Sequence, residues 1–114
     1  MFTNVFRKDG IDIGPPTPVT IGSTGALAVF GKGHYSVTSY TSTTDAITSI
    51  SGCQAGDVIT LRPTSTHTIT VTDGTNLKLG GDHDFVMNNI SDNITLYCES
   101  AGVFSEVMGR VSNG

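Results

Sequence analysis

The second half of the chain consists of short runs in which apolar and polar residues alternate, separated by residues that favour turns. Alternation with a period of two places the apolar side chains on one face of an extended strand. The runs are Val58–Arg62, His67–Thr72, Asn76–Leu79, Asp84–Asn88, Asn93–Cys98 and Val103–Met108. Regular short strands of this kind are typical of a sandwich, a barrel or a solenoid. The sequence therefore predicts an all-β protein whose body is a short-stranded β-solenoid, a β-prism or barrel-like.

The composition agrees with strands rather than helices. Thr, Val and Ile contribute 17, 10 and 9 residues, so nearly a third of the 114 residues are β-branched. Such side chains are stiff at χ1 and fit a pleated surface better than a helix. Tyr35–Tyr40 alternates in the same way, whereas Ala46–Ile50 fits either one helical turn or a short strand. An all-helical bundle is therefore disfavoured.

Residues 1–34 differ from the rest of the chain in their many glycines and prolines. Three of the four prolines lie between positions 15 and 18, where each fixes its own φ and keeps the preceding residue extended. The short apolar pieces around them cannot form a core of their own. We therefore expect an extended N-terminal arm with a Pro/Gly-rich connector at 1–34 and a β-rich body at 35–114. The arm would pack on the body of this chain or on a neighbouring subunit.

The chain has fewer apolar residues than an average globular domain. Hydrophobic residues make up 37% of the chain, and short strands leave exposed sheet edges that a small protein must cover. A symmetric assembly solves both problems by sharing one core among several chains. We therefore expect an obligate oligomer.

Charge and hydropathy narrow the choice of partner. The net charge is −4 with only six Lys and Arg, which disfavours a nucleic-acid binder. No apolar run approaches the length of a membrane span. The first ten residues contain no basic stretch followed by an apolar one, so we expect no secretory signal but a complete gene product made in a cytoplasm. The expected partners are therefore proteins, neither nucleic acid nor membrane.

Two cysteines, Cys53 and Cys98, lie far apart in the sequence and form no Cys-x-x-Cys motif. This spacing argues against a zinc site and against a thioredoxin-like site. We expect two buried, reduced thiols that behave as small hydrophobic residues, with a disulfide between them as the alternative.

The one dense cluster of potential metal ligands in the sequence is Asp82-His83-Asp84. Successive side chains of a strand point to opposite faces, so only Asp82 and Asp84 could share an ion. A polar turn between Leu79 and Phe85 is the preferred interpretation. No motif for a nucleophile, a zinc protease or a phosphate loop occurs. We therefore expect no cofactor and no enzymatic activity; a small carbohydrate-acting enzyme is the minor alternative.

The stretch from Gly52 to Arg110 carries a combination of short motifs. These are Gly56-Asp57-Val58-Ile59-Thr60-Leu61, Ile69-Thr70-Val71-Thr72-Asp73-Gly74-Thr75-Asn76-Leu77-Lys78-Leu79, Asp92-Asn93-Ile94-Thr95-Leu96-Tyr97 and Phe104-Ser105-Glu106-Val107-Met108-Gly109-Arg110. The combination resembles the β-rich trimeric module of tailed-bacteriophage virion proteins, a group that includes capsid decoration proteins, head fibres and tail fibres. The resemblance covers about half of the chain.

This resemblance implies a homotrimer in which short strands from three chains wind about a common axis. The trimer core would be formed by Ile59, Leu61, Ile69, Val71, Leu77, Leu79, Ile94 and Leu96.

The resemblance also implies a structural role in the virion. We expect a capsid decoration or cement protein that is made in the host cytoplasm, lies on the capsid surface and is anchored to the major capsid protein by its N-terminal arm. The alternative is a small trimeric tail-tip or tail-fibre adhesin that binds a receptor on the host surface. The arm residues expected to contact the capsid are Val5, Phe6, Arg7, Lys8, Ile11 and Ile13.

Overall fold

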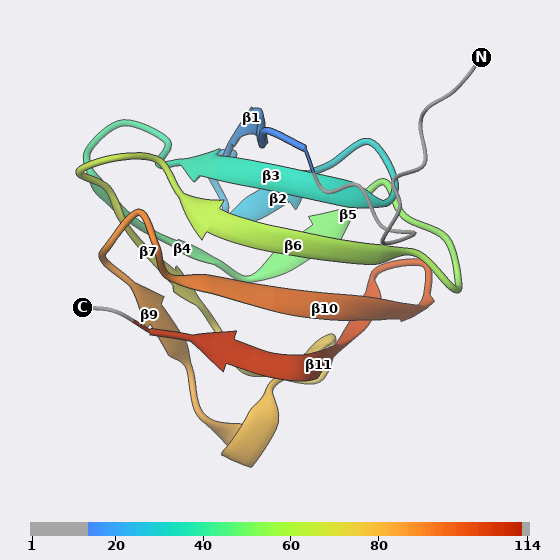
Figure 1. Ribbon diagram of the computed structural model, residues 1–114. Helices are drawn as coiled ribbons and strands as arrows, with labels where there is room; N and C mark the ends of the chain where they lie inside the picture. The colour runs from blue at the N-terminus through green and yellow to red at the C-terminus, as the bar shows by residue number, and fades with distance from the viewer. Residues whose placement is uncertain (1–13, 113–114) are drawn as a thin grey trace.

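The computed structural model of the chain describes residues 14–112, which form strands joined by short turns (Figure 1). The elements in chain order are β1 (Thr17–Thr20), β2 (Ala26–Ala28), β3 (Gly33–Thr38), β4 (Thr44–Ile47), β5 (Ser49–Ser51), β6 (Val58–Pro63), β7 (Thr68–Val71), β8 (Leu77–Lys78), the 3-10 turn η1 (Gly80–Asp82), β9 (Phe85–Met87), β10 (Asn93–Ser100) and β11 (Val103–Val111). The predicted all-β class is confirmed. The segment that fitted a helical turn or a strand is extended and belongs to β4 and β5.

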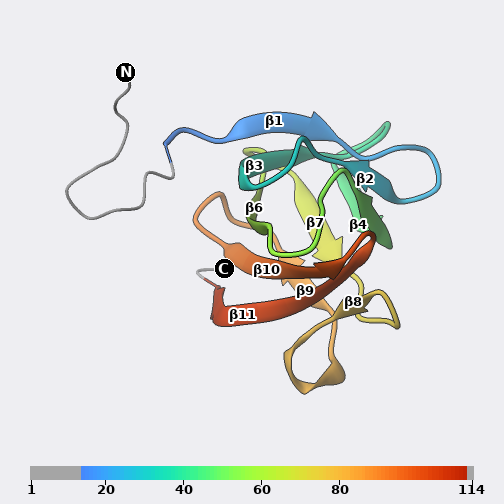
Figure 2. The same ribbon diagram turned by 90° about the vertical axis from the view of Figure 1, so that its right-hand side faces the viewer.

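The strands lie in three sheets that form the walls of a stack of coils. The largest sheet has the order β1-β3-β6-β10-β11-β8, and the smaller sheets are β2-β5 and β4-β7-β9. The chain passes from wall to wall and returns one layer further on, so strands one coil apart are parallel. In this way β1 pairs with β3, β3 with β6, β2 with β5 and β4 with β7. Figure 2 shows these walls around a common interior, the solenoid-like arrangement that was among the predicted architectures.

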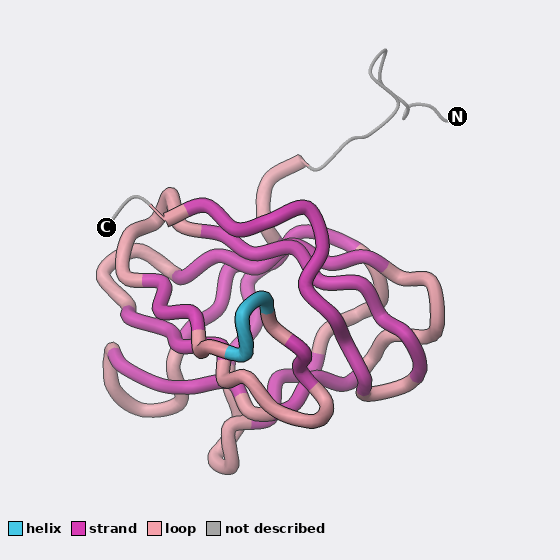
Figure 3. Tube along the Cα trace, turned by 90° about the horizontal axis from the view of Figure 1, so that it is seen from below, coloured by secondary structure: helices cyan, strands magenta, loops and turns pink. Residues whose placement is uncertain are grey.

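The last two long strands depart from the parallel pattern. β10 runs antiparallel to β6, and β11 runs antiparallel to β10. The short strand β8 then pairs in parallel with the outer edge of β11. Seen from below (Figure 3), η1 lies in the connection between β8 and β9. The C-terminal hairpin therefore ends the parallel stack and ties its last layer to the β8–β9 connection.

Apolar side chains that alternate along the strands fill the interior. In β6 the inward residues are Ile59 and Leu61, whereas Val58 points outward. From the wall that contains β7, Ile69 and Val71 point into the same interior. The buried apolar residues are Val19, Ile21, Leu27, Val29, Tyr35, Val37, Ile47, Ile50, Cys53, Ile59, Leu61, Ile69, Val71, Leu77, Leu79, Phe85, Met87, Ile94, Leu96, Cys98 and Phe104.

The eight residues expected to form a core shared by three chains lie in this single-chain interior. They are Ile59, Leu61, Ile69, Val71, Leu77, Leu79, Ile94 and Leu96, and none is more than 5% exposed. Side chains that their own chain already covers cannot line a contact with another chain. The expectation that the chain lacks a self-sufficient core is therefore wrong. Stacked coils bury the inward residues of every wall against one another, so short strands and a modest apolar content are sufficient.

The domain boundary expected after residue 34 is also wrong, because it falls inside β3. Both β1 and β2 are built into the sheets, and Val19 and Leu27 are buried there. Residues 14–34 thus pack on the body of this chain, one of the two arrangements considered. Pro18 fits because β1 is an edge strand: the N–H of Ile21 donates to the carbonyl of Thr38, and the alternation of a parallel ladder then leaves Pro18 on the open edge.

Gly52 lies where the turn after β5 passes against the end of β2, and this contact gives a stability test. Its φ is +101°, and a Cβ there would collide with the carbonyl oxygen of Val29. Gly56 lies four residues further on with a φ of +97° and open space around its Cβ position. We expect Gly52→Ala to lower the free energy of unfolding by about 3 kcal/mol or more, measured by urea unfolding. Gly56→Ala should cost only about 1 kcal/mol, because backbone strain is its sole penalty.

Equal losses in the two variants would contradict the close approach of the two turns. They would show that backbone conformation alone determines the cost at both glycines.

Candidate functional site at the N-terminal junction

The residues expected to contact a capsid, Val5, Phe6, Arg7, Lys8, Ile11 and Ile13, lie outside the described residues. The structure does describe the place where the N-terminal segment meets the body. We call this place the N-terminal junction and define it by Gly14, His34, Arg62 and Ile90. These residues come from the segment before β1, from β3, from β6 and from the loop between β9 and β10. Hydrogen bonds connect all four.

The hydrogen bonds of the N-terminal junction fix the protonation of its histidine. Nε of Arg62 lies 2.7 Å from Nε2 of His34, and a guanidinium can only donate. Nε2 must therefore accept, so the imidazole is neutral and carries its proton on Nδ1. Nδ1 then donates to the carbonyl oxygen of Gly14, 3.1 Å away. Nη1 of Arg62 also donates to the carbonyl oxygen of Ile90 at 3.0 Å.

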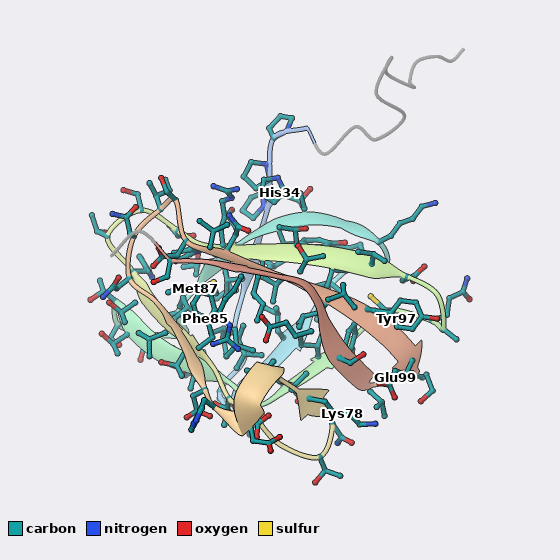
Figure 4. The ribbon with its side chains drawn as sticks, turned by 60° about the horizontal axis from the view of Figure 1, so that its bottom comes forward. His34, Lys78, Phe85, Met87, Tyr97 and Glu99 are labelled. Atoms are coloured by element: carbon teal, nitrogen blue, oxygen red, sulfur yellow. The ribbon has the colours of Figure 1, made fainter. Side chains whose placement is uncertain are left out.

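The parallel register of β3 and β6 brings the two side chains of the N-terminal junction together. His34 pairs with Thr60, and Ser36 pairs with Arg62. Both side chains belong to the outward face of the large sheet, because Tyr35 and its alternate neighbours point into the core. His34 is nevertheless only 9% exposed. Figure 4 shows it beside the segment that precedes β1.

The loop that receives Arg62 is itself held by a buried carboxylate. Asp92 is fully buried, and its Oδ2 accepts from the backbone N–H groups of Asn88 and Asn89, at 3.0 and 3.2 Å. These bonds fix the turn in which Ile90 presents its carbonyl oxygen to Arg62. The acceptor for the guanidinium therefore belongs to an ordered turn.

A second cluster, which we call the C-terminal clasp, joins β11 to the β8–β9 connection. Glu106 accepts two hydrogen bonds from Arg110, at 2.6 and 3.0 Å, and one from the N–H of Gly80 at 2.7 Å. The guanidinium of Arg110 lies 4.5 Å from the centre of the Phe85 ring. The side chain of Glu106 is only 8% exposed. Hydrogen bonding from Arg110 holds the pKa of Glu106 below its ordinary value, and the same contact raises the pKa of Arg110.

A third feature lies at one end of the large sheet on its outward face, where Figure 4 shows three of its members. We call it the outward patch: Val58, Tyr97, Lys78 and Glu99. Val58 and Tyr97 are opposite each other on β6 and β10 and are 40% and 39% exposed. Lys78 and Glu99 form an exposed ion pair at 3.0 Å, and hydrogen bonding from Lys78 lowers the pKa of Glu99. The outward patch therefore combines an exposed aromatic ring with hydrogen-bonding groups.

The cluster Asp82-His83-Asp84 lies in a turn, as the sequence predicts. Asp82 ends η1 with a φ of +58°. Oδ1 of Asp84 accepts from the N–H of Asp73, and Oδ1 of Asp73 accepts from the N–H of Leu79. Within residues 14–112 no group of three or more His, Cys, Asp or Glu side chains is arranged to hold a metal ion. The carboxylates whose contacts are described hold the turn together.

Sequence reasoning did not single out the contact between Ser39 and His67. Nδ1 of His67 accepts from the N–H of Ser39 at 3.2 Å and lies 3.1 Å from its hydroxyl oxygen. The backbone N–H therefore occupies the lone pair that a general base would need, and Ser39 is 3% exposed. The pair closes the turn after β3. The partners are 28 residues apart, and no local pattern marks them.

Cys53 and Cys98 are free and buried, as predicted. Burial, with a contribution from the nearby Asp57, raises the pKa of Cys53 to about 11 and raises the pKa of Cys98 as well. Both thiols are therefore protonated at neutral pH. They serve as core residues and lack the reactivity of a thiolate.

Comparisons with protein-family models, with curated proteins and with solved structures give no match. No helix among the described residues is long and apolar enough to cross a membrane.

The C-terminal clasp gives a prediction with a built-in control. We expect Glu106→Gln to lower the free energy of unfolding at pH 7 by about 2 kcal/mol, because Arg110 loses its carboxylate partner. Glu99→Gln, which removes the exposed partner of Lys78, should change stability little. Urea unfolding of the three proteins measures both effects.

The pH dependence of this effect has a definite sign. The pKa of Glu106 is lowered in the folded state, so its stabilisation is present above the ordinary glutamate pKa and is lost as the pH falls through the folded-state value. The difference between wild type and Glu106→Gln should therefore shrink below about pH 4. A difference that stays constant down to pH 3 would contradict an ionic role for Glu106.

Proposed function

We propose that this chain is a structural virion protein of a tailed bacteriophage. It decorates or cements the capsid surface as a homotrimer, and its N-terminal arm anchors it to the major capsid protein. The role is one of binding, without a catalytic step.

The observation that carries this proposal is the N-terminal junction beside a body with its own core. His34 and the pairing of β1 with β3 fix the place at which the arm joins the body. The described residues already enclose an apolar interior. An arm with apolar residues that is joined at a fixed point to such a body is suited to binding a partner.

The chemistry of the arm indicates the kind of contact. Val5 and Phe6 would be buried against the capsid protein, and Arg7 and Lys8 would pair with acidic groups around that contact. Main-chain pairing with an exposed strand edge of the capsid protein would add affinity. Three arms on one trimer would multiply the strength of attachment.

A deletion that ends at residue 13 tests this mechanism, because it leaves Gly14 and all of β1 in place. We expect the truncated protein to fold and to lose attachment to capsids that lack the protein, measured by co-sedimentation. Phe6→Asp should weaken attachment at least about tenfold, because an unpaired carboxylate would be buried in the contact. Phe30→Asp is the matched control, since Phe30 is 78% exposed on the body, and it should attach like wild type.

Unchanged saturation of capsids by the truncated protein would place the anchor in the body. That result would overturn the arm mechanism.

The homotrimer is tested separately by mass. Because the core lies within one chain, a trimer must form through outward surfaces. Light scattering at micromolar concentration should give about three times the 11.9 kDa of one chain. A monomer mass would remove the trimer from the proposal and leave the arm mechanism to the deletion test.

The outward patch favours a second candidate, a small trimeric tail-tip or tail-fibre adhesin. An exposed tyrosine next to hydrogen-bonding side chains can stack on a ligand such as a sugar ring. Binding of the isolated protein to host cells, and its loss in Tyr97→Ala, would support this candidate. Imaging of virions that carry a labelled copy separates the two, because it places the protein on the head or on the tail.

A further inference from the structure

We propose that His34 is a pH-sensitive latch for the start of β1, closed at neutral pH and open in mildly acidic solution. The closed latch holds Gly14, the first described residue, against the body. The consequence for attachment rests on the proposed function, whereas the latch itself concerns described residues alone.

The closed latch requires a neutral imidazole. Arg62 can only donate, so Nε2 of His34 must keep its lone pair for the 2.7 Å hydrogen bond. The single ring proton is then on Nδ1, where it reaches the carbonyl oxygen of Gly14. The neutral imidazole with its proton on Nδ1 therefore satisfies both Arg62 and Gly14.

Protonation of His34 destroys this arrangement. The imidazolium carries a proton on each nitrogen, so two donors would face each other across the 2.7 Å between Nε2 and Nε of Arg62. Two positive charges would also lie in contact in a site that is largely shielded from water. Acid that protonates this ring therefore opens the latch.

The groups around His34 determine which part moves. Nη1 of Arg62 donates to the carbonyl oxygen of Ile90, and this hydrogen bond holds the guanidinium in place. Within residues 14–112 the imidazole has hydrogen bonds to Gly14 and Arg62 alone, and rotation of the ring away from Arg62 takes Nδ1 away from Gly14. The start of β1 then loses a contact. Because β3 is the one described strand that pairs with β1, the first residues of β1 open before the rest of the sheet.

The described elements around the latch carry few charged groups. Between Gly14 and Thr20 the chain has no titratable side chain. The loop reached by Arg62 contains Asp92, whose Oδ2 accepts from the N–H groups of that loop. From β6 the charged group is Arg62 itself. Among the described residues, Arg62 is the charged group that forms a hydrogen bond with the ring.

Any experiment must distinguish the pH response of His34 from that of a second histidine, His67. Nδ1 of His67 accepts from the N–H of Ser39, so protonation would disturb that contact as well. Ser39 follows the C-terminal end of β3, whereas His34 lies near its start. A reporter at the beginning of β1 distinguishes the two.

Hydrogen–deuterium exchange of the Thr17 and Val19 amides provides this reporter. Exchange rates are converted to protection factors, which remove the intrinsic effect of pH, and are compared at pH 7.5 and pH 5.5. In wild type we expect the protection factors of both amides to fall about tenfold in acid, while those of β6 stay constant. This measurement uses the intact protein without any capsid.

Three variants make the result specific. His34→Gln keeps one donor and one acceptor without a titratable ring, so its protection factors should not change with pH. His83→Gln removes a histidine from the exposed turn before β9 and should respond like wild type. Arg62→Met removes the opposing cation, so the fall in acid should be much smaller than in wild type. If His34→Gln does not fold, Arg62→Met still tests the latch.

An equal fall in wild type and His34→Gln, or constant protection in wild type, would overturn the latch. Capsid co-sedimentation at both pH values is read independently. Weaker attachment of wild type in acid, together with constant attachment of His34→Gln, is the expected result. If the protection factors fall in acid but the protein attaches to capsids at no pH, the latch is supported and the proposed function is contradicted.

Discussion

Each coil of this molecule obtains its backbone hydrogen bonds from the neighbouring coil, and the rest of the structure depends on that exchange. Strands as short as β2 and β5 would not be stable in isolation. Stacked in parallel, they satisfy each other's main chains while their inward residues meet in one interior. The antiparallel hairpin of β10 and β11 gives the last coil a partner. At the other end of the stack the edge strand is β1. Pro18 lies on its open edge and removes a hydrogen-bond donor that another chain could use.

Much of the fold could be predicted from the period-two pattern, but the assignment of strands to walls could not. Ile59 and Ile69 lie in similar alternating runs, yet they reach the interior from different sheets. The pattern says which face is apolar and says nothing about which strand lies beside it. Because the pattern does not show which strands are neighbours, it also led to the expectation of a core shared among chains. Low apolar content indicates a shared core only when each chain forms a single open layer. The prolines near residue 15 misplaced the body boundary because Pro18 fits an edge strand as well as it fits a connector.

The candidate site was beyond sequence reasoning for a related cause. His34 lies 20 residues from Gly14 and 28 from Arg62, and only the register of β3 on β6 brings them together. The C-terminal clasp depends on a bulge: Thr95 pairs with Val107 and Ile94 with Arg110, so residues 108 and 109 have no opposite partners. This irregularity shortens the path from Glu106 to Arg110 compared with an extended strand. The Glu-Val and Arg pieces of the resemblance therefore have a local structural role, whatever partner the protein binds.

The central claim is that the described residues of one chain complete a core without the help of another chain. Amide hydrogen–deuterium exchange across about a hundredfold range of protein concentration tests this claim most directly. An intrachain core predicts that the amides of the central strands β6 and β10 exchange slowest, at rates that do not change on dilution. Faster exchange of β6 and β10 in the dilute samples would contradict the account, because it would show that other chains complete the core.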